Sequence, residues 1–180
     1  MAKDSEILSL LSDGETQKQG FELLVRTYSE PLYYKVRHIV LYHDDANDVL
    51  QNAFIKVWNH LSSFRGQSSL ATWLYRIAIN EALDFIRKQK QTDACSYDEL
   101  GTVANRLLAD EFFDGDEAQA LLQEAIATLP PVQRTVFNLR YYDEMPYAEM
   151  SKTLETSEGA LKASYHLAVK KIMEYLRSRD

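Results

Sequence analysis

Residues 64–90 read FRGQSSLATWLYRIAINEALDFIRKQK, and this stretch decides how the first half of the chain folds. Gly66 and the two serines at 68 and 69 favour a turn followed by the start of a helix. After Ser69 no Gly or Pro interrupts the chain for about twenty residues, enough for a helix of roughly 30 Å. At about 100° per residue, one side of this helix collects the apolar residues Leu70, Leu74, Ile77, Ala78 and Phe85. We therefore predict a helix that buries this side in an α-helical core.

The remaining face of this predicted helix carries residues with binding chemistry. It presents Trp73, Arg76, Asn80 and Arg87, which are spaced three, four and seven apart. Arginines neutralise phosphate, aromatic rings stack on unpaired bases, and an Asn amide can read a base edge. The face therefore suits nucleic acid. A packing helix with solvated arginines and a core tryptophan fits the same residues, and Asp84 weakens the positive charge, so both interpretations stay open.

Composition and charge predict an all-α protein of two small domains. The 180 residues are 46% hydrophobic, and the chain has 11 Tyr but only 6 Gly and 4 Pro, which favours helices over strands and turns. The net charge of -7 lies entirely within residues 91–117, which hold one basic and eight acidic residues. This segment, which contains Gly101 and Gly115, predicts an acidic linker between a domain at 1–90 and a second domain at 118–180.

Several features that the sequence lacks narrow the class of protein. No apolar run approaches membrane-spanning length, the N-terminal residues are too charged for a secretory signal, and the lone Cys95 cannot form an intramolecular disulfide. These features predict a soluble cytoplasmic protein without direct membrane insertion. The four histidines form no HExxH pattern, no Gly-rich phosphate loop is present, and Cys95 has no evident base. We therefore expect no metal, no cofactor and no catalytic residues.

A second predicted helix, at 46–61, carries an unusual outer surface. Ala46, Ala53 and Val57 recur on its inner side, whereas its other faces carry Asp48, Gln51, Asn52, Ile55 and Asn59. An exposed isoleucine among amides and a carboxylate, with Trp58 beside it, predicts a protein-binding surface. An ordinary surface helix with one scattered apolar residue is the alternative that stays open.

The second half predicts a helix-turn-helix. A helix at 118–128 ends before Leu129-Pro130-Pro131, and another follows to Tyr141. A short helix at 147–154, a tight turn, and a long helix capped by Ser157 complete the pattern. The long helix projects Lys162, Ala163, His166 and Lys170 away from its apolar stripe. The lysines would meet phosphate and His166 would approach a base edge, although a helical hairpin needs no DNA.

Three motifs in one order carry a family resemblance. They are DDANDVLQNAFIKVWNHLSSF at 44–64, the stretch at 64–90, and the pair LPPVQRTVFNLRYYDEMPYAEMSKTL at 129–154 and SEGALKASYHLAVKKI at 157–172. Over essentially its whole length the chain resembles bacterial sigma factors of the extracytoplasmic-function group. The first motif is similar to that family's core-polymerase-binding helix, the second to its region for the promoter -10 element, and the pair to its -35-reading domain.

This resemblance implies a promoter-specific initiation factor with assigned surfaces. Core RNA polymerase would be held by Asp48, Gln51, Asn52, Ile55 and Trp58. The -10 element would be faced by Phe64, Arg65, Trp73, Arg76 and Asn80, with Arg87 on the same face. The -35 element would be read from the helix that begins at Ser157, through Lys162, Ala163, His166 and Lys170. The implied partners are core RNA polymerase, promoter DNA and an anti-sigma factor, which in this family is commonly membrane-bound.

The chain departs from the family at two places. The family usually has Glu where this chain has Asn52, and it commonly has arginines at the positions of Ser164, Leu167 and Val169. Fewer phosphate contacts should lower DNA affinity and flatten its dependence on salt. A helix-turn-helix regulator that works without polymerase is the alternative function. It would explain the second half but leave the surface at Asp48 and the loop at Arg65 without a role.

Overall fold

The computed structural model describes residues 2–92 and 103–179. Within these ranges every regular element is helical, which confirms the all-α prediction. The elements are α1 (Ala2–Ser12), α2 (Gln17–Val40), α3 (His43–His60), the 3-10 helix η1 (Leu61–Ser63), α4 (Leu70–Thr92), α5 (Val103–Leu108), α6 (Glu117–Ala127), α7 (Pro131–Tyr141), α8 (Tyr147–Leu154) and α9 (Glu158–Arg177). The part of the expected linker at 93–102, with Cys95 and Gly101, lies outside the described residues.

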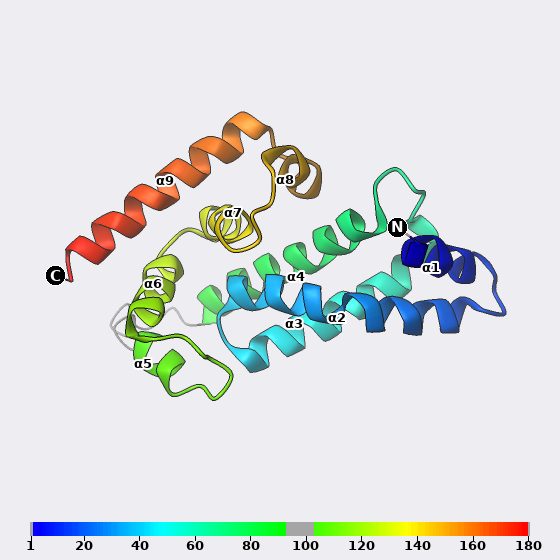
Figure 1. Ribbon diagram of the computed structural model, residues 1–180, viewed down its shortest axis with the longest axis horizontal. Helices are drawn as coiled ribbons and strands as arrows, with labels where there is room; N and C mark the ends of the chain where they lie inside the picture. The colour runs from blue at the N-terminus through cyan, green and yellow to red at the C-terminus, as the bar shows by residue number, and fades with distance from the viewer. Residues whose placement is uncertain (1, 93–102, 180) are drawn as a thin grey trace.

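Helix α4 is the predicted central helix of the first half, and α2 and α3 pack against it (Figure 1). Ser69 caps it, because the Thr72 amide donates to the Ser69 hydroxyl at 3.1 Å. The predicted apolar side is confirmed at Leu70, Leu74 and Ala78, but Ile77 and Phe85 are only half-buried. The neighbouring positions Ile79, Ala82 and Ile86 are buried as well. The reason is that α7 and α8 also contact α4, so its buried surface is wider than one stripe.

Helix α2 contains a proline well inside its length. Pro31 suggests the first turn of a new helix, yet α2 runs unbroken from Gln17 to Val40 with Pro31 inside it. A proline within a helix loses one hydrogen bond and crowds the preceding turn. Here the apolar residues on both sides of Pro31 share one buried face, and their burial keeps the helix continuous. These residues are Leu24, Tyr28, Leu32 and Val36.

The second half contains the predicted helix-turn-helix, formed by α8 and α9. Glu155 adopts a left-handed conformation with φ of 52°, which ends α8 and turns the chain. Ser157 then caps α9 by accepting a hydrogen bond from the Ala160 amide at 3.3 Å. Leu161, Ala168 and Ile172 of α9 are buried, as the apolar stripe predicts. Ala168 and Ile172 pack in a separate small core with residues of α6 and α7.

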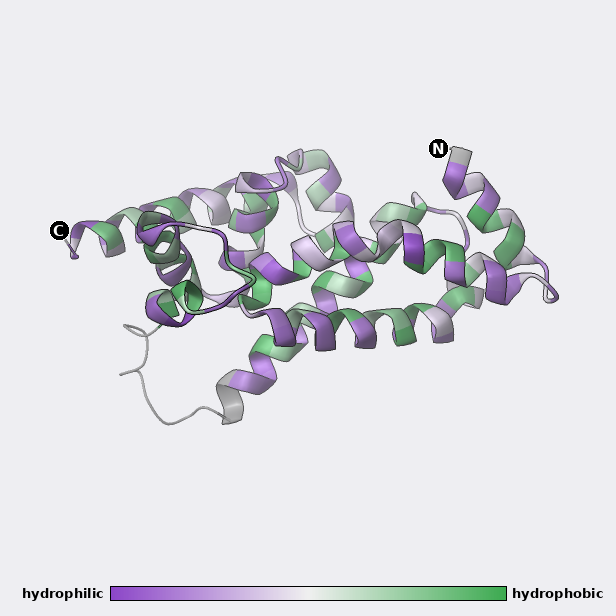
Figure 2. Cartoon of the chain, turned by 60° about the horizontal axis from the view of Figure 1, so that its bottom comes forward, coloured by the Kyte–Doolittle hydropathy of each residue, from purple (hydrophilic) through white to green (hydrophobic). Residues whose placement is uncertain are grey.

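The two halves also pack on each other. Helix α7 lies against α2 and α4, and α8 lies against α4 (Figure 1). Apolar residues of the second half join the same core as α2 and α4, and these residues are Val136, Leu139, Met145, Met150 and Leu161. In Figure 2 the hydrophobic bands of several neighbouring helices face the interior between them. None of the helices in 2–92 or 103–179 combines the length and the apolar character that crossing a membrane requires.

Candidate protein and nucleic-acid interfaces

The outer side of α3 holds all five residues predicted to bind polymerase. Asp48, Gln51, Asn52, Ile55 and Trp58 are each exposed, and their helical spacing places them on one surface, which we call the α3 outer face. Ile55 is 58% exposed and Trp58 is 42% exposed. An apolar centre surrounded by amides and a carboxylate has the composition of a protein-binding patch.

The opposite side of α3 fixes this face to the core. Val49, Ala53 and Val57 are buried against the rest of the bundle. Lys56 forms an ion pair with Glu81 of α4, which ties the two helices together beside the core. The Trp58 ring also contacts Phe21 of α2, with ring centroids 4.9 Å apart in an edge-on arrangement. The α3 outer face is therefore presented on a rigid support.

The loop before α4 and the first turns of α4 form an aromatic recess. Gly66 has a φ of +67°, a conformation that side chains disfavour, and it turns the loop towards α4. The rings of Phe64 and Trp73 lie 5.1 Å apart and are tilted by 50°. A cavity of about 220 Å³ lies beside both rings and is also lined by Leu8 and Leu11 of α1. Such a recess can stack a planar group.

The remaining predicted DNA-facing residues of the first half differ in their surroundings. Arg65 and Asn80 are exposed. Arg87 is exposed and pairs with Asp84 of the same helix at 3.0 Å. Arg76 is not free, because its Nη1 lies 2.8 Å from the Glu155 carboxylate and its Nη2 donates to the Lys152 carbonyl at 2.6 Å. Helical spacing places Arg76, Asn80 and Arg87 on one side of α4, and Arg76 is engaged there by the turn of the helix-turn-helix.

The predicted DNA-facing residues of α9 also share one exposed face. Ser157, Lys162, Ala163, His166 and Lys170 are all exposed. Lys162 lies 3.7 Å from Glu158, and Lys170 lies 3.9 Å from Glu174. Exposed pairs one helical turn apart contribute little stability, so both lysines can exchange these carboxylates for phosphate. The face therefore suits the backbone and one groove of a duplex.

Sequence reasoning missed the residues that join the two halves. Arg134 and Asn138 of α7 are 6% and 2% exposed. Arg134 donates to the Ile39 carbonyl at 3.2 Å, and Asn138 donates to the His38 carbonyl at 2.7 Å. The only sequence signal is a polar pair four residues apart in an apolar helix, which must find partners if it is buried. Nothing local indicates that these partners lie on α2.

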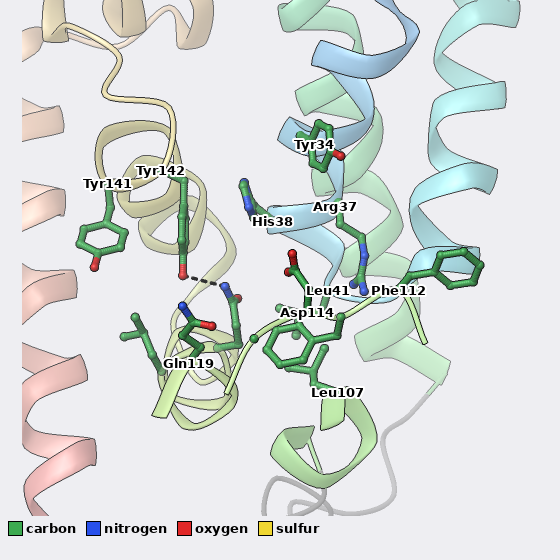
Figure 3. Close-up of a pocket in the computed structure, with 14 residues that line it drawn as sticks. Tyr34, Arg37, His38, Leu41, Leu107, Phe112, Asp114, Gln119, Tyr141 and Tyr142 are labelled. Carbon is green, nitrogen blue, oxygen red and sulfur yellow. Dashed lines mark hydrogen bonds between the residues drawn. The ribbon is translucent and has the colours of Figure 1, made fainter. Parts of the chain in front are cut away.

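A cavity of about 270 Å³ lies at this junction, between α2, the segment after α5, and α6 with α7 (Figure 3). The His38 ring stacks on the Tyr142 ring with centroids 4.3 Å apart. Gln123 donates to the Tyr142 hydroxyl at 2.7 Å, the bond that is dashed in Figure 3. On the other wall Arg37 pairs with Asp110 at 2.8 Å. Side chains from both halves and from the segment between them therefore meet here.

Burial at this junction changes two pKa values. Burial lowers the pKa of His38, and the cations Arg37 and Lys35 act in the same direction against the opposing effect of Asp143. Burial also raises the pKa of Tyr142 to about 12, with a contribution from Tyr141. The stacked pair is therefore neutral in the folded chain near pH 7.

We predict a fall in stability on the acid side that depends on His38. Because the folded-state pKa of His38 is depressed, neutral His38 stabilises the fold above the unfolded pKa of about 6.5, and this contribution is lost as pH falls below it. Urea unfolding between pH 7.5 and pH 5 should therefore show a smaller loss of stability for His38→Gln than for the unmodified chain. His60→Gln, at an exposed histidine, is the control and should follow the unmodified chain. An identical slope for His38→Gln would contradict the assignment.

Comparison with known proteins finds two family matches, which follow one another along the chain. Residues 24–92 match the family Sigma-70 region 2, and residues 119–172 match Sigma-70, region 4. The ECF RNA polymerase sigma factor SigX of Bacillus subtilis is 32% identical over 168 residues, which cover 89% of this chain and 87% of SigX. The α3 outer face and the start of α4 lie in the first match, and the helix-turn-helix lies in the second.

Two solved structures share the fold. CnrH, in a structure with the cytosolic domain of CnrY, aligns with a TM-score of 0.70 at 21% identity over 99% of both chains. The sigma factor RpoE of Bartonella quintana, in a structure with the anti-sigma factor NepR, aligns with a TM-score of 0.63 at 19% identity over 87% of this chain and 96% of RpoE. These likenesses concern the fold, whereas the similarity to SigX extends through the sequence. The chain belongs to the extracytoplasmic-function (ECF) RNA polymerase sigma factors.

Proposed function

We propose that this sigma factor directs promoter-specific initiation through three surfaces on separate helices. The domain at 1–90 binds core RNA polymerase and the -10 element, the acidic segment at 91–117 links the halves, and the domain at 118–180 reads the -35 element. The observation that carries the polymerase contact is the exposed apolar centre formed by Ile55 and Trp58. Hot spots of protein interfaces are apolar or aromatic residues of this kind surrounded by polar groups.

For the -10 element, the aromatic recess supports capture of unpaired bases. Phe64 and Trp73 offer stacking surfaces beside a cavity, and base stacking on aromatic rings is largely independent of sequence. Asn80 can read the edge of an unpaired base, while Arg65 and Arg87 neutralise phosphates of the same strand. Binding the unpaired strand in this way favours the melted promoter over the duplex.

For the -35 element, the exposed face of α9 supports docking in the major groove. Lys162 and Lys170 contact phosphates, and His166 between them approaches a base edge. Ala163 and Ser157 have small side chains, which lets the start of the helix come close to the groove. Ser164 and Val169 are half-buried and Leu167 is exposed. Because none of these three positions carries an arginine, Lys162 and Lys170 are the main phosphate contacts of this face.

The salt dependence of promoter binding tests the two lysines. Each phosphate contact contributes about one unit to the slope of log affinity against log salt, so Lys162→Ala with Lys170→Ala should reduce that slope by about two. The measurement is binding of the polymerase complex to a duplex promoter fragment across a range of salt concentrations. Lys171→Ala is the control, because Lys171 is also exposed on α9 but donates to Gln133 of α7 at 3.0 Å. Equal slopes in all three proteins would remove the phosphate role.

The proposed function also implies a regulatory partner and a cellular location. The structure of RpoE with an anti-sigma factor supports a comparable partner for this chain, one that covers the polymerase- and DNA-facing surfaces. In this family such a partner is commonly membrane-bound. The chain acts in the cytoplasm, where core polymerase and the chromosome are found. It supplies binding surfaces, and the catalytic residues of RNA synthesis belong to the polymerase.

Run-off transcription tests the proposal as a whole. Core RNA polymerase from the source organism is assayed with and without the purified chain on a pool of genomic fragments. Start sites that require the chain support the proposal, and their shared upstream sequences identify both promoter elements. If no such start sites arise and the chain does not bind core polymerase, the α3 outer face has been misassigned. Sequence-specific duplex binding by the chain alone would then favour the polymerase-independent regulator.

A further inference from the structure

The cavity of about 270 Å³ between α2, the segment after α5, and α6 with α7, which we call the junction cavity, has exposed aromatic rings around it. Tyr34, Phe112 and Tyr141 all line the cavity, and each side chain is more than half exposed. Single exposed apolar side chains are ordinary on a protein surface, whereas several around one hollow are typical of a ligand-binding groove. Ligand pockets are lined mainly by such rings, with a few polar groups inside.

Neighbouring rings hold two of these aromatic side chains in place. Tyr34 packs edge-on against Tyr33, with ring centroids 5.5 Å apart. Tyr141 stacks on Phe137, with ring centroids 5.2 Å apart. Side chains that are already ordered lose little conformational freedom when a ligand binds, so this part of the cavity is prepared for binding.

The segment after α5 forms another wall of defined shape. The Phe112 amide donates to one oxygen of the Asp110 carboxylate at 2.9 Å, and the other oxygen pairs with Arg37 at 2.8 Å. At position 115 a Cβ would overlap the Phe113 ring, so Gly115 allows this ring to fold back against the main chain. The wall is therefore set by specific contacts.

Two polar atoms that face the junction cavity lack partners. Gln123 is 9% exposed, and its Nε2 donates to the Tyr142 hydroxyl at 2.7 Å. Its Oε1 and the Nδ1 atom of His38 are buried without a hydrogen-bond partner among the described residues. A buried acceptor without a partner is costly, and either a ligand donor or an ordered water can satisfy it. The interior of the cavity therefore asks for hydrogen-bond donors.

Charge indicates which kind of donor fits. The lining contains one cation and one carboxylate, Arg37 and Asp114 (Figure 3). Arg37 is engaged by Asp110, whereas no described residue pairs with the exposed Asp114. The faces of the tyrosine rings also attract cations. A cationic ligand would therefore gain a charged partner that an anion would lack.

We propose that the junction cavity binds a small planar cation, namely an aromatic ring that carries an amine, amidine or guanidine group. Its ring lies between the tyrosines, and its N–H groups donate to Gln123 Oε1 and to the Asp114 carboxylate. Pockets for drug-sized ligands have on the order of 300–1,000 Å³, so this cavity fits a ligand of one or two rings. None of its lining residues is assigned to polymerase or promoter DNA, so the site is separate from the proposed function.

Three probes of one shape and different charge test the site. Benzamidine is a planar cation, benzamide is its neutral counterpart, and benzoate is the anion. Isothermal titration calorimetry with the full chain measures the affinity of each probe, and two-dimensional amide NMR locates its position. We expect benzamidine to bind about tenfold more tightly than benzamide, and benzoate to bind most weakly. The side-chain amide signals of Gln123 should shift on addition of benzamidine.

Matched variants assign the two polar contacts. Asp114→Asn removes the charge but keeps the shape, so it should weaken benzamidine about tenfold with little change for benzamide. Glu111→Gln is the control, because Glu111 is an exposed carboxylate of the same segment that does not line the cavity. It should bind both probes as the unmodified chain does. Gln123→Met removes the acceptor and should weaken benzamidine and benzamide alike, by about fivefold.

The possible outcomes decide between a ligand site and a cavity filled by solvent. If no probe shifts the Gln123 signals at millimolar concentration, the cavity holds solvent only and the proposal is overturned. Equal weakening of benzamidine by Asp114→Asn and Glu111→Gln would show general attraction to an acidic chain and would also overturn it. If Gln123→Met does not fold, Asp114→Asn still decides the result, because its exposed side chain supports no other contact. These measurements need no polymerase, so they are independent of run-off transcription.

Discussion

Ile55→Asp is expected to lower the affinity of the chain for core RNA polymerase by about 100-fold, or roughly 2.8 kcal/mol. Ile55 is the most exposed large apolar residue of the α3 outer face, at 58%. An aspartate there would have to lose its water at the interface without a cation prepared to receive it. The fold should be unaffected, because the isoleucine side chain does not support the core.

The measurement is a binding titration with core polymerase, followed by run-off transcription at a saturating concentration of each chain. Val132→Asp is the matched control, since Val132 is 53% exposed but lies in the first turn of α7, where a carboxylate is favourable. We expect Val132→Asp to bind core polymerase as the unmodified chain does. If both variants bind normally, α3 does not present the polymerase-binding surface.

Trp73→Ala is expected to reduce promoter opening by about 30-fold, within the range of about 1–3 kcal/mol that one base–aromatic stack contributes. The Trp73 ring forms one wall of the recess with Phe64, so its removal leaves an unpaired base without a stacking partner. The effect should fall on the melted promoter complex, because the α3 outer face is unchanged. Affinity for core polymerase should therefore remain normal.

Permanganate reactivity of unpaired thymines at a promoter found by run-off transcription measures this opening. Trp73→Tyr keeps an aromatic ring at the same position and should recover most of it. Trp73 is half-buried, so urea unfolding of both variants must show a folded chain at the assay temperature. Normal opening by Trp73→Ala would assign the capture of unpaired bases to another surface.

The sequence was most informative where local signals agree. Ser69 and the apolar repeat that follows it predicted α4, and the turn before Ser157 predicted the helix-turn-helix. Local signals also misled at Pro31, where burial of a whole helix face outweighs the cost of one proline. The helix propensity of a residue affects only the few residues around it, whereas burial of the apolar face stabilises α2 along its full length.

The junction between the halves could not be predicted in the same way. Arg134 and Asn138 find their acceptors 95 and 100 residues earlier in the chain, and these acceptors belong to the main chain. No periodicity or motif encodes such a pairing. The engagement of Arg76 by Glu155 is equally non-local, so the sequence indicated a DNA-facing arginine but gave no sign of its contact in the free chain.

The hydrogen bonds from Arg134 and Asn138 of α7 to main-chain carbonyls of α2 also have an evolutionary consequence. Every amino acid carries a carbonyl, so replacing the side chain at position 38 or 39 leaves the acceptor groups in place. The donors, in contrast, are the side chains of two particular residues in α7. Substitutions at positions 38 and 39 of α2 therefore leave this contact intact, whereas a single substitution at Arg134 or Asn138 would weaken it. Related chains could gain or lose the contact by changes in α7 alone, with α3 unchanged.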